Sequence, residues 1–182
     1  MQFIPTEIPA VIEIIPRVFS DDRGDFFESF QQEKFNLAIG QNIQFVQDNE
    51  SVSKKHVVRG LHFQIPPFAQ GKLVRVIQGA VLDVAVDIRK NSPTFGKHIK
   101  RLLSAENKHQ LWIPEGFAHG FVALEEATIF QYKCTNFYHT ASEQSLRWDD
   151  PDLAIDWGIT AGVLSSKDAT APLFQSFETP FL

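Results

Sequence analysis

Two short stretches of the sequence place a histidine where it could take part in chemistry. In VVRGLHFQ, period-two alternation puts His62 on one face of a strand with Gly60 and Gln64, and Arg59 on the other face or at the strand end. In WIPEGFAHGF, His119 lies between two glycines that let other groups approach the backbone closely. A histidine can accept or donate a proton at neutral pH, so each is a candidate general base. A hydrogen-bonded structural histidine, or one that caps a strand end, fits each stretch equally well.

Three other residues interrupt apolar runs. Alternation places Tyr132 on one strand face with Phe130 and Cys134, so its phenol projects into the interior if that face lines a barrel. Lys72 opens one apolar run, and Asp83 breaks another, where a carboxylate needs a histidine or lysine as partner. Taken singly, Tyr132 also fits a core tyrosine bonded to the backbone, and Lys72 a solvated lysine.

The spacing of the histidines argues against a metal centre. Metal-binding β-barrels often use a His-x-His pair followed by a glutamate and a later histidine, but here His62 is followed by Phe63 and Gln64. The single cysteine, Cys134, excludes a disulfide within the chain and a zinc cluster. The sequence therefore predicts chemistry without a metal.

Composition narrows the class of protein. The 182 residues are 43% hydrophobic and 21% charged, which is typical of a soluble globular chain, and we expect one domain over residues 1–182. Seventeen Lys and Arg against 22 Asp and Glu give a net charge of -5, so we expect no nucleic-acid partner. No apolar run of membrane-spanning length is present, so we expect no membrane contact. The lone cysteine favours a reducing, cytoplasmic setting.

The elements that must position these residues are mostly β-strands. Short runs rich in Val, Ile, Leu and Phe alternate with Gly and Pro, which is typical of a sandwich, jelly roll or barrel. Gln78-Gly79 between two such runs predicts a hairpin. The expected strands cover residues 43–47, 57–64, 72–78, 80–88, 98–103, 119–124 and 128–135.

Helices are expected to be few and short. Ser29 to Ile39 fits one helix that ends at Gly40, and Ser165 or Ser166 fits the cap of a short turn near the C-terminus. The stretch after Asp149-Asp150-Pro151 is expected to form a C-terminal extension that packs back on the core.

Six motifs, in this order and mutual spacing, closely resemble the dTDP-4-dehydrorhamnose 3,5-epimerase family over nearly the whole chain. They are FSDDRGDFFESF (residues 19–30), QDNESVS (47–53), VVRGLHFQ (57–64), QGKLVRVIQGAVLDVAVDIR (70–89), WIPEGFAHGF (112–121) and QYKCTNFY (131–138). The resemblance implies an all-β, cupin-type jelly roll (a double-stranded β-helix barrel) with a few short helices. It also implies a homodimer in which an N-terminal strand of each subunit reaches the other.

The resemblance implies inversion of C3 and C5 of dTDP-4-dehydro-6-deoxy-D-glucose, which gives dTDP-4-dehydro-β-L-rhamnose. Both hydrogens lie next to the C4 ketone, so a base and an oxyanion donor suffice without a cofactor. It further implies His62 as proton acceptor, Asp168 as its carboxylate partner, Tyr132 as proton donor and Lys72 as the cation beside the enolate oxygen. The implied substrate-binding residues are Arg23, Glu28, Gln47, Asp48, Asn49, Arg59, Lys72, His119, Tyr138, Glu143 and Lys167.

Two alternatives stay open. A single-position epimerase acting on C3 or C5 of a related dTDP-4-keto sugar would keep the same base and acid. A sugar-nucleotide binding module without catalysis would not need both His62 and Tyr132, so the presence of both favours an enzyme.

Overall fold

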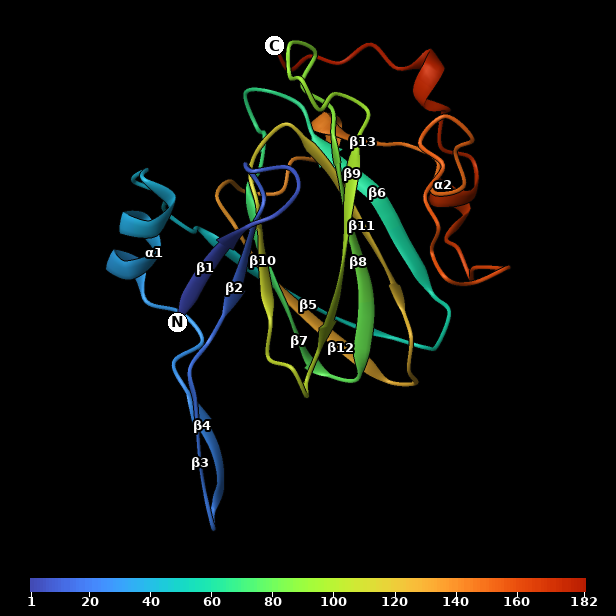
Figure 1. Ribbon diagram of the computed structural model, residues 1–182. Helices are drawn as coiled ribbons and strands as arrows, with labels where there is room; N and C mark the ends of the chain where they lie inside the picture. The colour runs from blue at the N-terminus through green and yellow to red at the C-terminus, as the bar shows by residue number, and fades with distance from the viewer.

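The computed structural model describes residues 1–182 as two antiparallel β-sheets that lie face to face (Figure 1). The six-stranded sheet has the order β1-β2-β10-β7-β12-β5, and the five-stranded sheet has the order β13-β6-β11-β8-β9. This arrangement confirms the predicted all-β jelly roll. The strands of the first sheet are β1 (Gln2–Pro5), β2 (Ile12–Ile15), β10 (Gln110–Ile113), β7 (Lys72–Gln78), β12 (Thr128–Cys134) and β5 (Gln47–Ser53).

The second sheet carries the strands on which the remaining motifs lie. Its strands are β13 (Glu143–Ser145), β6 (Val58–Gln64), β11 (Phe117–Ala123), β8 (Ala80–Asp87) and β9 (His98–Ser104). A separate two-stranded ribbon, β3 (Val18–Asp21) with β4 (Gly24–Phe27), projects away from the two sheets (Figure 1).

The predicted hairpin at Gln78-Gly79 is wrong. β7 pairs with β10 and β12, whereas β8 pairs with β9 and β11, so the chain crosses from one sheet to the other at this turn. Gly79 has a φ of 77°, and a Cβ there would lie 2.5 Å from Thr128 Oγ1. The glycine is therefore required by the turn and by close packing, but neither requirement makes the flanking strands pair.

The predicted strand over residues 43–47 is also wrong, because pairing in β5 begins only at Gln47. Ile43 and Phe45 instead pack in a small cluster with Phe35 and Trp112 on the outer face of the six-stranded sheet. Their alternation reflects contact with a helix and not membership of a sheet. The sequence missed the six short strands β1, β2, β3, β4, β10 and β13.

The helices are short, as expected. α1 (Gln32–Ile39) ends at Gly40, which adopts the left-handed conformation with φ 71°, and it begins later than predicted because the Gln31 side chain caps Lys34 N–H. α2 (Ser166–Ala169) is capped by Ser165, as predicted. Two single 3-10 turns cover Thr140–Ser142 and Phe174–Ser176.

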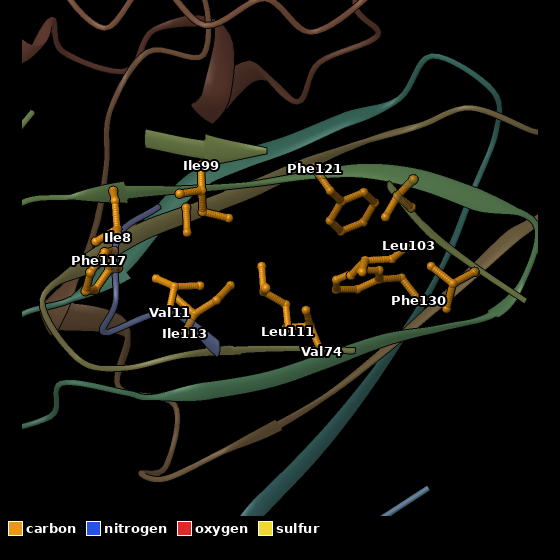
Figure 2. Close-up of a cluster of buried hydrophobic side chains, with 13 residues drawn as sticks. Ile8, Val11, Val74, Ile99, Leu103, Leu111, Ile113, Phe117, Phe121 and Phe130 are labelled. Carbon is orange, nitrogen blue, oxygen red and sulfur yellow. The ribbon is translucent and has the colours of Figure 1, made fainter. Parts of the chain in front are cut away.

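The interior between the sheets is filled by apolar side chains from both of them (Figure 2). Val74, Leu111 and Phe130 come from the six-stranded sheet, and Ile99 and Phe121 face them from the five-stranded sheet. Two members of this cluster, Phe121 and Phe130, also line the cavity that holds the polar side chains of the interior.

A second apolar cluster covers the outside of the five-stranded sheet. Val84 and Val86 of β8 and Leu61 of β6 pack there against Leu153 and Trp157 of the C-terminal extension. The extension thus packs back on the core, and it carries α2 to the edge of β6.

Candidate active site

His62 of β6 and Asp168 of α2 form a hydrogen-bonded pair, with 2.5 Å between His62 Nε2 and Asp168 Oδ1. The pair is fixed from both sides. His62 is held in register opposite His119 of β11 and Ser145 of β13. Asp168 donates its backbone N–H to Ser165 Oγ at 3.1 Å, so the cap of α2 also orients the carboxylate. Since Nε2 is used by Asp168, Nδ1 is the ring nitrogen left free to meet a substrate.

The Asp168 carboxylate keeps its negative charge despite burial. Desolvation alone would raise its pKa, but the hydrogen bond and charge of His62, with help from Ser165 and the Gly60 backbone, hold the pKa of Asp168 below its ordinary value. An ionised carboxylate beside an imidazole stabilises the positive charge that the ring gains when it takes up a proton. The pair is therefore suited to accept a proton from carbon.

Arg59 lies on the same side as His62, contrary to the strict alternation expected from the sequence. His62 pairs with His119, yet Arg59 pairs with Phe121, so three steps along β6 match two along β11. This bulge turns the side chain of Arg59 to the cavity, where Arg59 Nε donates to Ser53 Oγ at 3.1 Å. Gly60 permits the bulge, because a Cβ there would lie 2.5 Å from Gly120 Cα.

Lys72 and Tyr132 lie on the opposite sheet. They belong to the paired strands β7 and β12, and Lys72 Nζ lies 5.9 Å from the centre of the Tyr132 ring. Burial raises the pKa of Tyr132 to about 12, with a further rise from Cys134 and an opposing effect of Arg59. The phenol is therefore protonated at neutral pH and can donate its proton.

Burial also lowers the pKa of Lys72, although the nearby Cys134, Glu143 and Asp83 oppose that shift. A cation in such a dehydrated position interacts strongly with any negative charge that develops beside it. Burial therefore weakens the charged form of Lys72, and a negative charge that develops beside the amine favours that form again.

His119 is buried and carries its own carboxylate partner. His119 Nε2 lies 2.9 Å from Asp83 Oδ2, and Asp83 is fully buried, as the break in its apolar strand suggested. The other oxygen, Asp83 Oδ1, has no hydrogen-bond partner. Behind this pair, Phe121 and Phe130 stack with their ring centres 4.1 Å apart.

These side chains share one cavity of about 370 Å³ between the two sheets. Eight residues proposed from the sequence line it, namely Arg59, His62, Lys72, His119, Tyr132, Glu143, Lys167 and Asp168. The five other lining residues, which the sequence analysis did not propose for the site, are Glu50, Ser51, Phe121, Phe130 and Ser165. Ser51 could have been found by extending alternation from Asn49, and Phe121 by extending it from His119.

The mouth of the cavity is organised around Glu143. Its Oε2 atom accepts a hydrogen bond from the Tyr138 hydroxyl at 2.8 Å and lies 2.5 Å from Lys167 Nζ. Burial alone would raise the pKa of Glu143, but the bonds from Lys167 and Tyr138 hold it below its ordinary value. Tyr138 itself is 53% exposed, so one face of its ring is open to a ligand.

β5 divides its polar residues between two faces. Gln47 and Asn49 point inward, where Gln47 Nε2 donates to Asn49 Oδ1 at 3.0 Å and Asn49 Nδ2 contacts Cys134 Sγ. Asp48 points to the outer face and pairs with Lys133. The structure therefore brings Gln47 and Asn49, but not Asp48, to the cavity side.

Arg23 and Glu28 are not brought to the cavity of their own chain. Arg23 lies at the tip of the β3-β4 ribbon and pairs with Asp21, while Glu28 follows β4 and pairs with Lys34. The ribbon extends away from the two sheets (Figure 1). Neither Arg23 nor Glu28 lines the cavity between the two sheets of its own chain.

Two other features of the chain bear on its chemistry. The structure has no group of three or more His, Cys, Asp or Glu side chains arranged to hold a metal ion. It also has no helix long and apolar enough to cross a membrane. The cavity itself holds His62 on one sheet, with Tyr132 and Lys72 on the sheet that faces it.

The model of one family, described as dTDP-4-dehydrorhamnose 3,5-epimerase, matches residues 5–176 of the chain. The chain belongs to this family. A dTDP-4-dehydrorhamnose 3,5-epimerase from Salmonella typhimurium is 58% identical over 176 residues, which are 96% of each chain. As a member of the dTDP-4-dehydrorhamnose 3,5-epimerase family, the chain is an enzyme of the epimerase class.

Solved structures of the family share the fold. The epimerase from Legionella pneumophila, in complex with dTDP-4-keto-L-rhamnose, has a TM-score of 0.94 and 49% identity, covering 97% of this chain and 94% of that one. A 3'-monoepimerase from Streptomyces bikiniensis in complex with dTDP-quinovose has a TM-score of 0.89 and 34% identity, covering 93% of this chain and 86% of that one. The fold alone therefore does not fix how many carbons are inverted.

Proposed function

We propose that the chain inverts C3 and C5 of dTDP-4-dehydro-6-deoxy-D-glucose and releases dTDP-4-dehydro-β-L-rhamnose. The single observation that carries this proposal is the placement of a base and an acid on opposite sheets. A proton is removed from one face of the sugar by His62, and a proton is delivered to the other face by Tyr132. Removal and return from opposite faces invert the carbon.

His62 Nδ1 takes the proton from the carbon next to the C4 ketone. The electron pair of the broken C–H bond forms a double bond between that carbon and C4, and the electrons of the ketone C=O bond move onto its oxygen. The result is an enolate. Asp168 stabilises the imidazolium that forms, and no cofactor is required. Before the second inversion, His62 releases its proton to solvent and the Tyr132 phenolate takes one up, and the same steps then act at the other carbon next to the ketone.

Lys72 lies beside the enolate oxygen and stabilises its negative charge. Such an interaction is worth several kcal/mol in a site with little water. Tyr132 then donates its hydroxyl proton to carbon, and its pKa of about 12 keeps the phenol protonated until that step. His119, held by Asp83, lines the same cavity as a substrate-binding residue.

The nucleotide part of the substrate is bound at the mouth. Arg59 suits the diphosphate, because a planar guanidinium can donate two parallel hydrogen bonds to phosphate oxygens. Tyr138 stacks on the thymine ring, with Glu143 and Lys167 as polar neighbours of the nucleoside. Gln47 and Asn49 bind from the inner face of β5, whereas Asp48 on its outer face pairs with Lys133.

We further propose that the enzyme is a homodimer in the cytoplasm. A dimer gives a role to the projecting β3-β4 ribbon, since Arg23 and Glu28 would then bind substrate in the partner's cavity. Phe19 and Phe26 pair on the same ribbon and are 51% and 72% exposed, so they form a small apolar patch that a partner subunit would cover. The cytoplasmic location rests on the single buried cysteine.

The test is incubation of the wild-type protein with dTDP-4-dehydro-6-deoxy-D-glucose in heavy water, followed by NMR of C3 and C5. We expect deuterium and inversion at both carbons. Inversion at one carbon alone would replace the proposal with the single-position epimerase, the activity named for the relative from Streptomyces bikiniensis. No exchange at either carbon would overturn the proposed activity on this substrate.

A further inference from the structure

The segment that carries Tyr138 is held by glutamine side chains from both sheets. Gln64 of β6 donates from Nε2 to Phe137 O at 3.1 Å and accepts at Oε1 from His139 N–H at 2.8 Å. Gln47 of β5 accepts from Tyr138 N–H at 2.9 Å. The backbone is therefore fixed at Tyr138 and at the residues before and after it, although the segment lies outside any helix or strand.

Gln64 is the more deeply placed of the two glutamines, with only 4% of its surface exposed. Its Nε2 atom also donates to Phe68 O at 2.6 Å, so the amide connects the loop that contains Phe68 to the segment of residues 137–139. The Phe68 ring in turn stacks on the His139 ring, with centres 3.8 Å apart. The Gln64 amide thus makes three hydrogen bonds to the backbone. Loss of this side chain would leave two carbonyls and one N–H without their partner.

The position of Gln64 also links Tyr138 to the catalytic pair. Gln64 follows His62 by two residues on the same face of β6, so the two lie about 6.6 Å apart along the strand. Gln64 pairs in register with Glu143, which accepts the hydrogen bond from the Tyr138 hydroxyl. One strand therefore carries the catalytic base and the support of the exposed aromatic ring.

We propose that Gln64 is a positioning residue, which holds residues 137–139 so that the ring of Tyr138 is preorganised to stack on the base of the nucleotide. The inference rests on the proposed function, in which Tyr138 is the stacking residue. A ring that is already fixed loses little freedom on binding, so preorganisation increases affinity without a direct contact between Gln64 and the ligand. Gln64 acts on binding and not on proton transfer.

The test compares Gln64→Met with the wild type, using dTDP binding by calorimetry and epimerisation at saturating substrate. We expect the dissociation constant for dTDP to rise about tenfold, the equivalent of one or two lost hydrogen bonds, while kcat stays within about twofold. The matched control is Gln78→Met, because Gln78 Nε2 donates to Ala127 O at the opposite end of β12. The control should leave both values unchanged.

A double-mutant cycle separates positioning from general damage. In a Tyr138→Ala background the ring is absent, so Gln64→Met should cost no further affinity for dTDP. An additional loss equal to that in the wild-type background would overturn the proposal. So would unchanged dTDP affinity in a folded Gln64→Met protein, or a fall in kcat at unchanged affinity.

If Gln64→Met fails to fold, Gln64→Glu provides the second variant. The carboxylate keeps an acceptor for His139 N–H but cannot donate to the two carbonyls, so the same loss of dTDP affinity at near-normal kcat is expected. Unchanged affinity in this variant would equally overturn the proposal. The binding measurement uses dTDP alone, so it is read separately from the heavy-water test of the proposed reaction.

Discussion

His62 and Asp168 lie 106 residues apart in the chain and 2.5 Å apart in space. Alternation along β6 predicted which residues of the local run share a face, but no local pattern links a strand histidine to a carboxylate in a four-residue helix. Only the family resemblance paired the two residues, and the contact now has a geometric basis. The assignment of His62 as the base stays a prediction.

His62→Ala should abolish both epimerisation and deuterium exchange, because the family resemblance assigns proton removal to no other residue of the cavity. Asp168→Asn should be less damaging, with a loss of about 10²- to 10⁴-fold, since the imidazole remains but its charged partner is gone. Rates are measured by NMR in heavy water on variants whose fold is checked by circular dichroism. Exchange at a near-normal rate in folded His62→Ala would require a different base.

Acid should remove the contribution of Asp168 to stability. Because the pKa of Asp168 is lowered in the folded state, the carboxylate stabilises the fold fully above its unfolded value of about 4 and loses this effect as pH falls through the folded pKa. The difference in unfolding free energy between wild type and Asp168→Asn should therefore shrink below about pH 4. Urea unfolding at several pH values measures it, and a difference that does not change with pH would contradict the cause given for the shift.

Alternation placed Tyr132 correctly, yet applied strictly it put Arg59 on the face opposite His62, and only the alternative position at the strand end agreed with the structure. Both predictions used the same period of two, and β12 is regular around Tyr132, whereas β6 contains the bulge next to Gly60. A bulge depends on how closely the neighbouring strand approaches. The sequence of β6 alone does not contain that information.

At the scale of the elements, the longer strands could be predicted and their partners could not. β8 and β11 have strong apolar runs, so their ranges were found within two residues. The sequence around Gly79 is compatible both with a hairpin and with a crossing between sheets. Which of the two forms depends on the pairing of β7 with β10 and β12, which lie far along the chain. Strands of three or four residues are too short to show a period.

The cap of α2 should affect catalysis as well as stability. Ser165→Ala removes the acceptor of Asp168 N–H, which costs about 1 kcal/mol of helix stability and frees the Asp168 carboxylate to turn from His62. We expect kcat to fall severalfold while KM is unchanged. Ser166→Ala is the control, since the side chain of Ser166 makes no cap; equal kcat values for the two variants would contradict this role of the cap.

At the scale of the whole molecule, the two sheets have separate tasks. The five-stranded sheet carries His62 and His119, the six-stranded sheet carries Lys72 and Tyr132, and the C-terminal extension supplies Asp168. The β3-β4 ribbon takes no part in this cavity. The assignment of residues 1–182 to one domain and the homodimer both stay predictions.

Mixed dimers test whether the ribbon acts on the partner. Arg23→Ala and His62→Ala should each lower activity, but after subunit exchange a mixed dimer holds one cavity with both residues intact. Half of the dimers are then mixed, and each has one intact site of two, so activity should recover to about a quarter of the wild-type value. Activity assays before and after exchange measure this, and no recovery despite demonstrated mixing would place Arg23 in its own chain's function.

The most direct test of the central claim, a base and an acid on opposite faces of the sugar, is Tyr132→Phe in heavy water. The variant keeps the ring that packs beside Phe130 and removes only the hydroxyl. His62 can still remove a proton and, after exchange with solvent, return deuterium to the same face. We predict deuterium at the carbons next to the ketone with little L-configured product. Product at the wild-type rate, or loss of exchange together with inversion in a folded protein, would contradict the assignment of Tyr132 as the proton donor.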